Sequence, residues 1–138
     1  MKDNERKKLI EAAVEAREKS YSPYSGFSVG AALLSASGKV YTGANIESAS
    51  YTPTVCAERV AFFTAVHSGE RDFSAIAIVG GSSEKGISSF TPPCGVCRQV
   101  MAEFAKADLE IILYDGKEMK VFTLSELLPM GFGKSNLE

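Results

Sequence analysis

The sequence predicts an α/β fold in which helices cover both faces of a mixed five-stranded sheet. Segments with helical periodicity alternate with strand-like segments in the order α-β-β-α-β-α-β-β. The apolar run FSAIAIVGG in the middle of the chain is typical of a strand that is covered on both faces. The short Asp115-Gly116 turn joins the last two strands, which should therefore be antiparallel, because parallel strands need a longer crossover.

The first half of the chain predicts a helix, a β-hairpin and a second helix. From about residue 3 to 19, apolar residues recur at helical spacing among charged ones: Leu9, Ile10, Ala13, Val14 and Ala16. The stretch VGAALLSASGKVYTGAN predicts two strands that are joined by a turn at ASGK. A helix from about residue 55 to 67 should turn four apolar residues toward the sheet: Ala57, Val60, Phe63 and Val66.

The second half predicts a strand, a helix, two more strands and a short final helix. FSAIAIVGG is the strand, and two prolines precede a helix from Cys94 to about Ala107. LEIILYD and EMKVFTL form the antiparallel pair. Thr123 and Glu126 have the spacing of a capping box, which predicts a helix directly after the last strand.

Length and composition indicate one globular domain that spans residues 1–138. The 138 residues are 45% hydrophobic, without an apolar run of transmembrane length, and no linker or repeat divides them. The charged N-terminus MKDNERKKLI lacks the apolar core of a signal peptide, which favours the cytoplasm. A formal net charge of −2 leaves no excess positive charge for nucleic acid, so we expect a small-molecule substrate and no nucleic-acid partner. The lack of a transmembrane-length run predicts no membrane partner.

The three cysteines of the chain lie where one metal site can form. Cys56 stands two residues before Glu58 at the start of the second helix, and Cys94 and Cys97 stand at the start of the third. Helices that follow strands begin at the same edge of a sheet, so the three thiols should converge. Three thiolates around one zinc leave a fourth position open for water, which is typical of a catalytic site. Glu58 would then accept and return protons.

Each of these residues also has a purely structural interpretation. A buried cysteine is often a small apolar residue, and a C-x-x-C pair can be a redox pair or half of a structural zinc site. A glutamate at a helix start often only complements the helix dipole. A structural zinc site would need a fourth protein ligand, and the single histidine, His67, should lie at the surface near the end of the second helix.

The two cysteine motifs carry a resemblance to a known family. CAER followed by PCGVCRQV resembles the zinc-dependent deaminases, whose signature pairs a His or Cys and a Glu two positions later with a downstream P-C-x-x-C. With SPYSGFSVGAALL and GANIESASY, the chain is similar to the small cytidine deaminases of free nucleosides from about Tyr21 to Phe132. The resemblance implies a three-layer α/β/α fold, one Zn²⁺ per subunit and a homotetramer with shared active sites. It also implies hydrolytic deamination of cytidine and deoxycytidine to uridine and deoxyuridine, with release of ammonia, in pyrimidine salvage.

The resemblance further implies roles for individual residues. Cys56, Cys94 and Cys97 would hold the zinc, Glu58 would be the catalytic proton shuttle, and Arg59 would balance the charge of the thiolates. Substrate would be contacted by six residues, the last two of which would complete a neighbouring subunit's site: Phe27, Asn45, Glu47, Ala57, Tyr51 and Phe132.

Other interpretations stay open at this point. Without the family, Asn45 would be assigned to a turn at a strand end and Glu47 to a solvated charge. Gly26 and Ser28 stand where the family frequently has Lys and Pro, which keeps open a deaminase of a modified or antibiotic cytosine nucleoside. An enzyme that edits nucleic acid is a less favoured alternative, because it would be expected to have a basic channel and this chain has a formal net charge of −2. A noncatalytic zinc-stabilised interaction module would need a fourth protein ligand and would give Glu58 no purpose.

Overall fold

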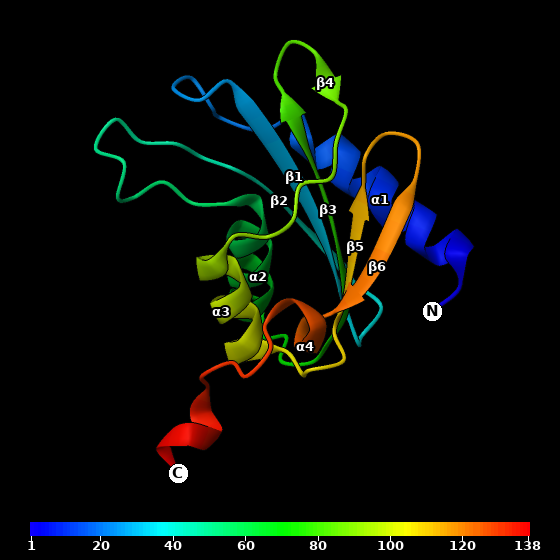
Figure 1. The fold of residues 1–138 in the computed structure, drawn as a ribbon, viewed down its shortest axis with the longest axis vertical. Coiled ribbons are helices and arrows are strands. Elements are labelled where there is room, and N and C mark those ends of the chain that lie inside the picture. The colour runs from blue at the N-terminus through cyan, green and yellow to red at the C-terminus, as the bar shows by residue number, and fades with distance from the viewer.

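A mixed sheet forms the centre of the fold in the computed structural model, which describes residues 1–138 (Figure 1). Its five main strands lie side by side in the order β2-β1-β3-β5-β6. Their bounds are Phe27–Ser35 for β1, Val40–Ala44 for β2, Phe73–Ser82 for β3, Glu110–Tyr114 for β5 and Met119–Thr123 for β6. Only β3 and β5 are parallel, and the last pair is antiparallel as predicted. A further strand of two residues, β4 (Gly86–Ile87), pairs with β3; it was not predicted, because so short a strand has no periodic pattern.

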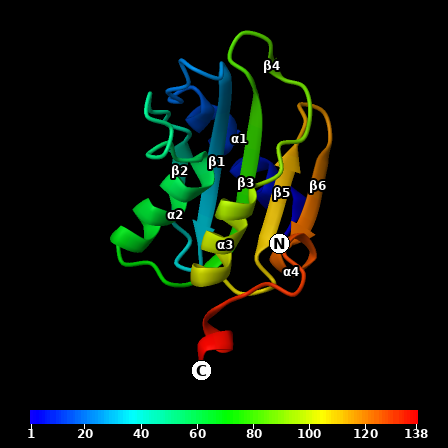
Figure 2. The same ribbon diagram turned by 60° about the vertical axis from the view of Figure 1, so that its left-hand side comes forward.

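Helices cover both faces of the sheet, which confirms the predicted three layers (Figure 2). The helix α1 (Asp3–Arg17) lies on one face, and α2 (Ala57–His67) and α3 (Gly95–Phe104) lie on the other. The short α4 (Leu124–Leu127) begins with the predicted capping box, and a 3-10 helix, η1 (Lys134–Leu137), ends the chain away from the sheet (Figure 1). None of these helices combines the length and the apolar character that crossing a bilayer requires.

The alternating side chains of β3 belong to two separate cores. Ala75, Ala77 and Val79 pack against α1, whereas Ile76 and Ile78 pack with α2 and α3. Both faces of this strand are therefore buried, as its apolar sequence predicts.

The buried face of α2 differs from the predicted one. Phe62 is fully buried against Phe73, with ring centroids 5.1 Å apart, whereas Phe63 is 46% exposed. Because each residue of an α-helix turns by about 100°, Phe63 lies about 200° around the helix from the buried Ala61. The prediction that Phe63 faces the sheet was wrong, since two adjacent phenylalanines do not reveal from the sequence which ring points inward.

The strand directions bring the beginnings of α2 and α3 to one edge of the sheet. The strands β2 and β3 are both antiparallel to β1, so they run in the same direction and end beside the start of β1. Because α2 follows β2 and α3 follows the β3–β4 hairpin, both helices start at that edge. The expected convergence of the two helix N-termini is therefore present.

Candidate active site

The loop between β2 and α2 is closed at its base, next to Cys56. Ile46 and Val55 exchange two backbone hydrogen bonds of 3.0 Å, which hold the end of β2 beside the start of α2. Cys56 is the N-cap of α2 and has an extended backbone, so it lies just outside the helix. Asn45, directly after β2, and Cys56 are thereby brought to the same site.

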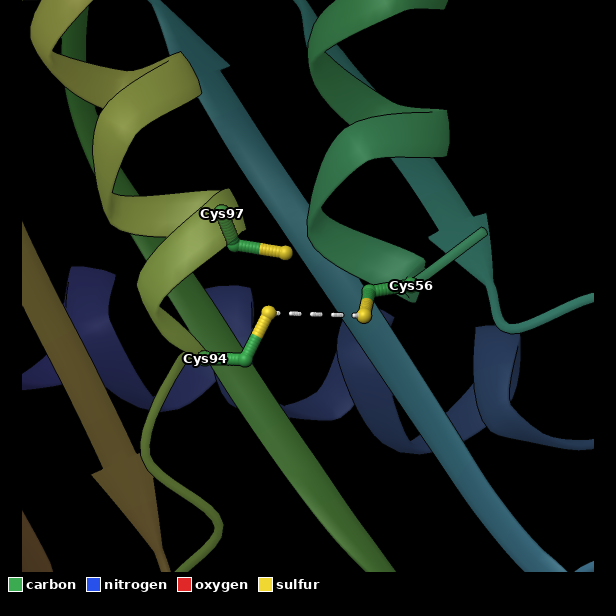
Figure 3. Close-up of side chains that lie close together, drawn as sticks. All are labelled: Cys56, Cys94 and Cys97. Carbon is green, nitrogen blue, oxygen red and sulfur yellow. Dashed lines mark hydrogen bonds between the residues drawn. The ribbon is translucent and has the colours of Figure 1, made fainter. Parts of the chain in front are cut away.

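Cys94 and Cys97 come from the start of α3. Cys94 is the N-cap of this helix, and Cys97 lies buried in its first turn. The sulfurs of Cys56 and Cys94 are 3.8 Å apart, and all three sulfurs lie within 4.8 Å of one another (Figure 3). In a tetrahedral zinc site with Zn–S bonds of about 2.3 Å, the sulfurs are about 3.8 Å apart. The cluster therefore fits one zinc ion and supplies three of its four ligands.

Hydrogen bonds around the sulfurs favour an ionised Cys56. The bond from Cys97 and then the guanidinium of Arg59, whose Nη2 lies 3.3 Å from the Cys56 sulfur, lower the pKa of Cys56 to about 5. The pKa of Cys97 is raised, because its thiol holds the proton that the pair shares. The free N–H groups at two helix N-termini add to the stabilisation of thiolates. Arg59 thus lies where charge balancing, its predicted role, is possible.

Glu58 lies in the first turn of α2, next to the sulfur cluster. Glu58 is buried, with only 4% of its surface exposed. Burial raises the pKa of Glu58 to about 7, and the charge of Cys56 adds to the rise. A carboxyl group with a pKa near neutrality can both accept and donate a proton at neutral pH, as a general acid-base group must. This position suits a proton shuttle better than a solvated charge at a helix start.

A cleft of about 320 Å³ opens beside the cysteines. It is lined by six of the residues that the sequence singled out: Phe27, Asn45, Glu47, Cys56, Glu58 and Cys94. They come from the start of β1, from the segment after β2 and from the two helix starts. The volume is in the range of pockets that hold one small organic ligand.

Asn45 is held by the strands themselves. Its Nδ2 donates to the Phe27 carbonyl at 2.8 Å, and its Oδ1 accepts from the Val29 backbone N–H at 2.9 Å and from the Ser20 hydroxyl. The amide therefore joins the start of β1 to the end of β2, which is a structural role that the sequence did not indicate. The second Nδ2 hydrogen is the part of Asn45 that is left for a ligand.

Glu47 is held in a similar way at the mouth of the cleft. Its Oε1 accepts from the backbone N–H groups of Tyr24 at 3.0 Å and Ser25 at 3.1 Å. The hydrogen bond from the Ser25 hydroxyl lowers the pKa of Glu47, so this carboxyl group is ionised at neutral pH. Glu47 is thus more than the solvated charge that its sequence context alone suggests.

The remaining candidate residues lie at the edge of the cleft or outside it. Ala57 is fully buried and does not line the cleft, so its contact with substrate stays a prediction. Tyr51 is 73% exposed at a left-handed φ of 62° and borders an adjoining hollow that also contains Glu47. Phe132 is 60% exposed and lines a separate hollow with Ala102 and Glu103 of α3. The chain does not bring Tyr51 and Phe132 into its own cleft, and their role in a neighbouring subunit stays a prediction.

Sequence reasoning missed other residues at the site. Thr91 and Ser25 line the cleft, and only their position beside the P-C motif and beside Phe27 hints at this. No pattern in the sequence indicates that Ser20 contacts Asn45. Arg98 directly follows Cys97 in the sequence, but its guanidinium donates to the carbonyls of Pro93 and Leu127 rather than to a cysteine sulfur.

Comparison with known proteins agrees with this site. Residues 3–113 match the family model described as the cytidine and deoxycytidylate deaminase zinc-binding region. The cytidine deaminase of Halalkalibacterium halodurans is 50% identical over 129 residues, which are 93% of this chain and 94% of that protein. The cytidine deaminase of Sporosarcina psychrophila is 47% identical over 131 residues, which are 94% of this chain and 93% of that protein.

A solved structure supports the same assignment. The crystal structure of cytidine deaminase from Burkholderia pseudomallei is 47% identical and has a TM-score of 0.83, covering 96% of this chain and 100% of that chain. The match to a zinc-binding region and the geometry of the cysteine cluster both agree with zinc as the cofactor. The sequence match, the shared fold and the cluster of three cysteines beside a buried glutamate lead to one conclusion: the chain belongs to the cytidine and deoxycytidylate deaminase family.

Proposed function

We propose that this chain catalyses the hydrolytic deamination of cytidine and deoxycytidine to uridine and deoxyuridine, with release of ammonia, and that it serves pyrimidine salvage. One observation carries the proposal: a cluster of three cysteine sulfurs borders, through Cys56 and Cys94, a cleft that Glu58 also lines. Phe27, Asn45 and Glu47 line the same cleft. The names of the similar proteins support a cytosine nucleoside as the substrate.

Glu58 would carry the protons of the reaction. Bound zinc supplies a Lewis acid that makes water nucleophilic near neutral pH. The Glu58 carboxylate takes one proton from the water that attacks C4 and delivers it to N3 of the pyrimidine. It then carries a second proton to the amino group on C4, which leaves as ammonia. The pKa of Glu58 near 7 allows both directions of transfer at neutral pH.

The other residues of the cleft would orient the nucleoside. The ring of Phe27, 40% exposed at the start of β1, can stack on the base. Asn45 and the ionised Glu47 can bind ribose hydroxyl groups through the free Nδ2 hydrogen and the carboxylate oxygens. The negative charge of Glu47 disfavours a phosphate group, so a free nucleoside suits the cleft better than a nucleotide or a nucleic-acid strand.

We also propose a homotetramer with active sites that are shared between subunits, located in the cytoplasm. The exposed aromatic side chains of Tyr51 and Phe132 support shared sites, because large apolar groups at the surface often mark contacts between subunits. Three free cysteines suit a reducing compartment.

A second candidate is a deaminase of a cytosine nucleoside with a modified sugar or base. Gly26, between the cleft residues Ser25 and Phe27, has a φ of +65° and open space where a side chain would be. The Ser28 hydroxyl lies on the other face of β1, where it hydrogen-bonds Ser83 at 2.7 Å, so it does not reach the cleft. A higher kcat/KM for a sugar-modified cytosine nucleoside than for cytidine would favour this candidate.

The decisive experiment combines metal analysis with an absorbance assay on cytidine. We expect about one zinc per chain, conversion of cytidine and deoxycytidine, and a kcat/KM at least about 10-fold lower on CMP, because the phosphate is repelled by Glu47. A fully active metal-free preparation would overturn the proposed chemistry. Equal efficiency on a single-stranded oligonucleotide would overturn the proposed substrate class.

A further inference from the structure

Two glycines lie on the sheet beneath the segments that carry the cysteines. Gly43 of β2 pairs with Ala31, and Gly80 of β3 pairs with Val29. Paired residues of neighbouring strands point to the same face, and here it is the face that α2 and α3 cover. Neither glycine has a positive φ, so turn geometry does not explain them.

Gly43 lies directly under the first turn of α2. A Cβ atom at this position would be 2.3 Å from the Ala57 carbonyl oxygen and 2.6 Å from the Ala61 nitrogen. Because non-bonded carbon contacts prefer about 3.5 to 4 Å, α2 would have to move by about 1 Å. The carbonyl that meets this Cβ belongs to the peptide between Ala57 and Glu58, directly after Cys56.

Gly80 has the same relation to the segment before α3. A Cβ atom there would be 2.6 Å from Thr91 Oγ1 and 3.0 Å from Thr91 Cβ. The Cβ of Thr91 is fixed to the backbone, so rotation of the side chain cannot relieve the contact. The segment that leads through two prolines to Cys94 would have to move by at least a few tenths of an ångström.

We propose that Gly43 and Gly80 are positioning residues for the metal site. Their missing side chains set how deeply the segments of Cys56 and Cys94 lie on the sheet, and this depth fixes the distance between the two sulfurs. The inference rests on the zinc site of the proposed function and adds to it two residues that contact neither metal nor substrate.

The tolerance of a zinc site explains why this depth matters. The present sulfur distance of 3.8 Å between Cys56 and Cys94 matches a tetrahedral site. Metal–ligand distances in working sites stay within about 0.2 Å of their preferred values. Cys94 and Cys97 belong to one helix and move together, whereas Cys56 belongs to another. A shift of α2 alone therefore changes the distances from the Cys56 sulfur to the other two sulfurs, while the distance between those two stays the same.

The structure contains a matched control on the opposite face of the sheet. A Cβ atom at Gly30 would be 2.1 Å from the Ala13 carbonyl oxygen and 2.5 Å from the Arg17 nitrogen, both in α1. Gly30→Ala therefore creates a clash between strand and helix as severe as that of Gly43→Ala, but against a helix that carries no cysteine. A general loss of stability should appear in both variants.

The experiment compares wild type, Gly43→Ala and Gly30→Ala, each loaded with zinc. Release of zinc to a chromogenic chelator and the absorption spectrum of the cobalt-substituted protein are measured, together with thermal melting. We expect zinc release from Gly43→Ala to be about 10- to 100-fold faster, because changing a residue that orients a ligand typically lowers metal affinity by about that factor. The cobalt bands of Gly43→Ala should shift, while Gly30→Ala should melt earlier but keep the wild-type release rate and cobalt spectrum.

Three results would overturn the inference. The first is wild-type zinc release from Gly43→Ala, and the second is equal acceleration in Gly30→Ala. If Gly43→Ala does not fold, Gly80→Ala decides by the same measurements, and wild-type release from Gly80→Ala is the third. A wild-type chain that binds no zinc would instead defeat the proposed function, and the inference with it, before any variant is compared.

Discussion

Glu58 has an environment that is unusual for a carboxyl group. A carboxyl group is rarely buried, and Glu58 is 4% exposed without taking part in any ion pair. Burial of a charge costs free energy unless the group becomes neutral or has partners, so a buried carboxyl group with a pKa near 7 indicates a function. Asn45 shows the opposite case, because its amide already has a structural role in joining two strands.

Glu58→Gln tests the shuttle role at the scale of one residue. The amide has nearly the same shape but cannot carry a proton, so kcat on cytidine should fall by at least about 100-fold. Zinc content should stay at the wild-type level, because the three sulfurs are untouched. Glu84→Gln, a change in the exposed turn between β3 and β4, is the control and should keep full activity. Turnover close to wild type in Glu58→Gln would show that Glu58 only complements the dipole of α2 and does not carry protons.

At the scale of the element, the site depends on where two helices begin. Cys56 and Cys94 are both N-caps, so each is the last residue before the chain becomes helical. This position places each cysteine beside the backbone N–H groups of the first helical turn, which have no partner within the helix. The remaining thiol, Cys97, follows one turn later on the buried side of α3. Two helix starts on one edge of the sheet are therefore sufficient to build the cluster.

The turn between β5 and β6 gives a prediction about one element. Asp115 Oδ1 accepts from the backbone N–H groups of Lys117 at 2.8 Å and Glu118 at 2.7 Å, and these bonds hold the pKa of Asp115 below its ordinary value. A carboxyl group with a lowered folded-state pKa stabilises the fold above its ordinary pKa, near 4, and this stabilisation is lost as the pH falls through the folded-state pKa. Asp115→Asn should therefore lower the urea midpoint at pH 7.

The difference between wild type and Asp115→Asn should then shrink as the pH is lowered from 5 to 3. Asp108→Asn is the control, because the Asp108 side chain makes no hydrogen bond within the chain. A difference that is the same at pH 7 and pH 3 would show that the turn does not depend on the charge of Asp115.

At the scale of the whole molecule, one chain leaves large apolar side chains in contact with solvent. Met130 is fully exposed, and Tyr51 and Met130 are the two non-glycine residues with positive φ. A left-handed backbone is costly for such side chains and marks places where surrounding structure or function maintains it. Both residues lie on segments that also carry the predicted inter-subunit contacts, Tyr51 itself and Phe132. Association of identical chains would cover them.

Phe132→Ala tests whether neighbouring chains share their sites. Phe132 lies outside its own chain's cleft and would instead complete the cleft of a neighbouring chain. We therefore expect Phe132→Ala to have a higher KM or a lower kcat on cytidine, with unchanged zinc content. Mixing Phe132→Ala with Glu58→Ala should give more activity than the average of the two, since sites with Glu58 from one chain and Phe132 from another are complete. Light scattering that shows an active monomer at assay concentration would contradict this prediction.

The sequence by itself determined the order of the elements, the antiparallel last pair of strands and the residue types of the site. These features depend on local patterns: the period of apolar residues, the Asp115-Gly116 turn, and thiols and a glutamate at two helix starts. The mixed sheet, its three layers and the final capping box are accordingly as predicted.

Only the tertiary structure decided which atoms meet. It placed Phe62 rather than Phe63 in the core, paired Asn45 with the backbone of β1, and set the distance between the sulfurs of Cys56 and Cys94. Each of these depends on how closely a helix or loop lies on the sheet, and that separation results from contacts between residues far apart in the sequence, such as Gly43 with the first turn of α2. Local periodicity contains no information about such contacts, because many packings are compatible with the same pattern of apolar residues.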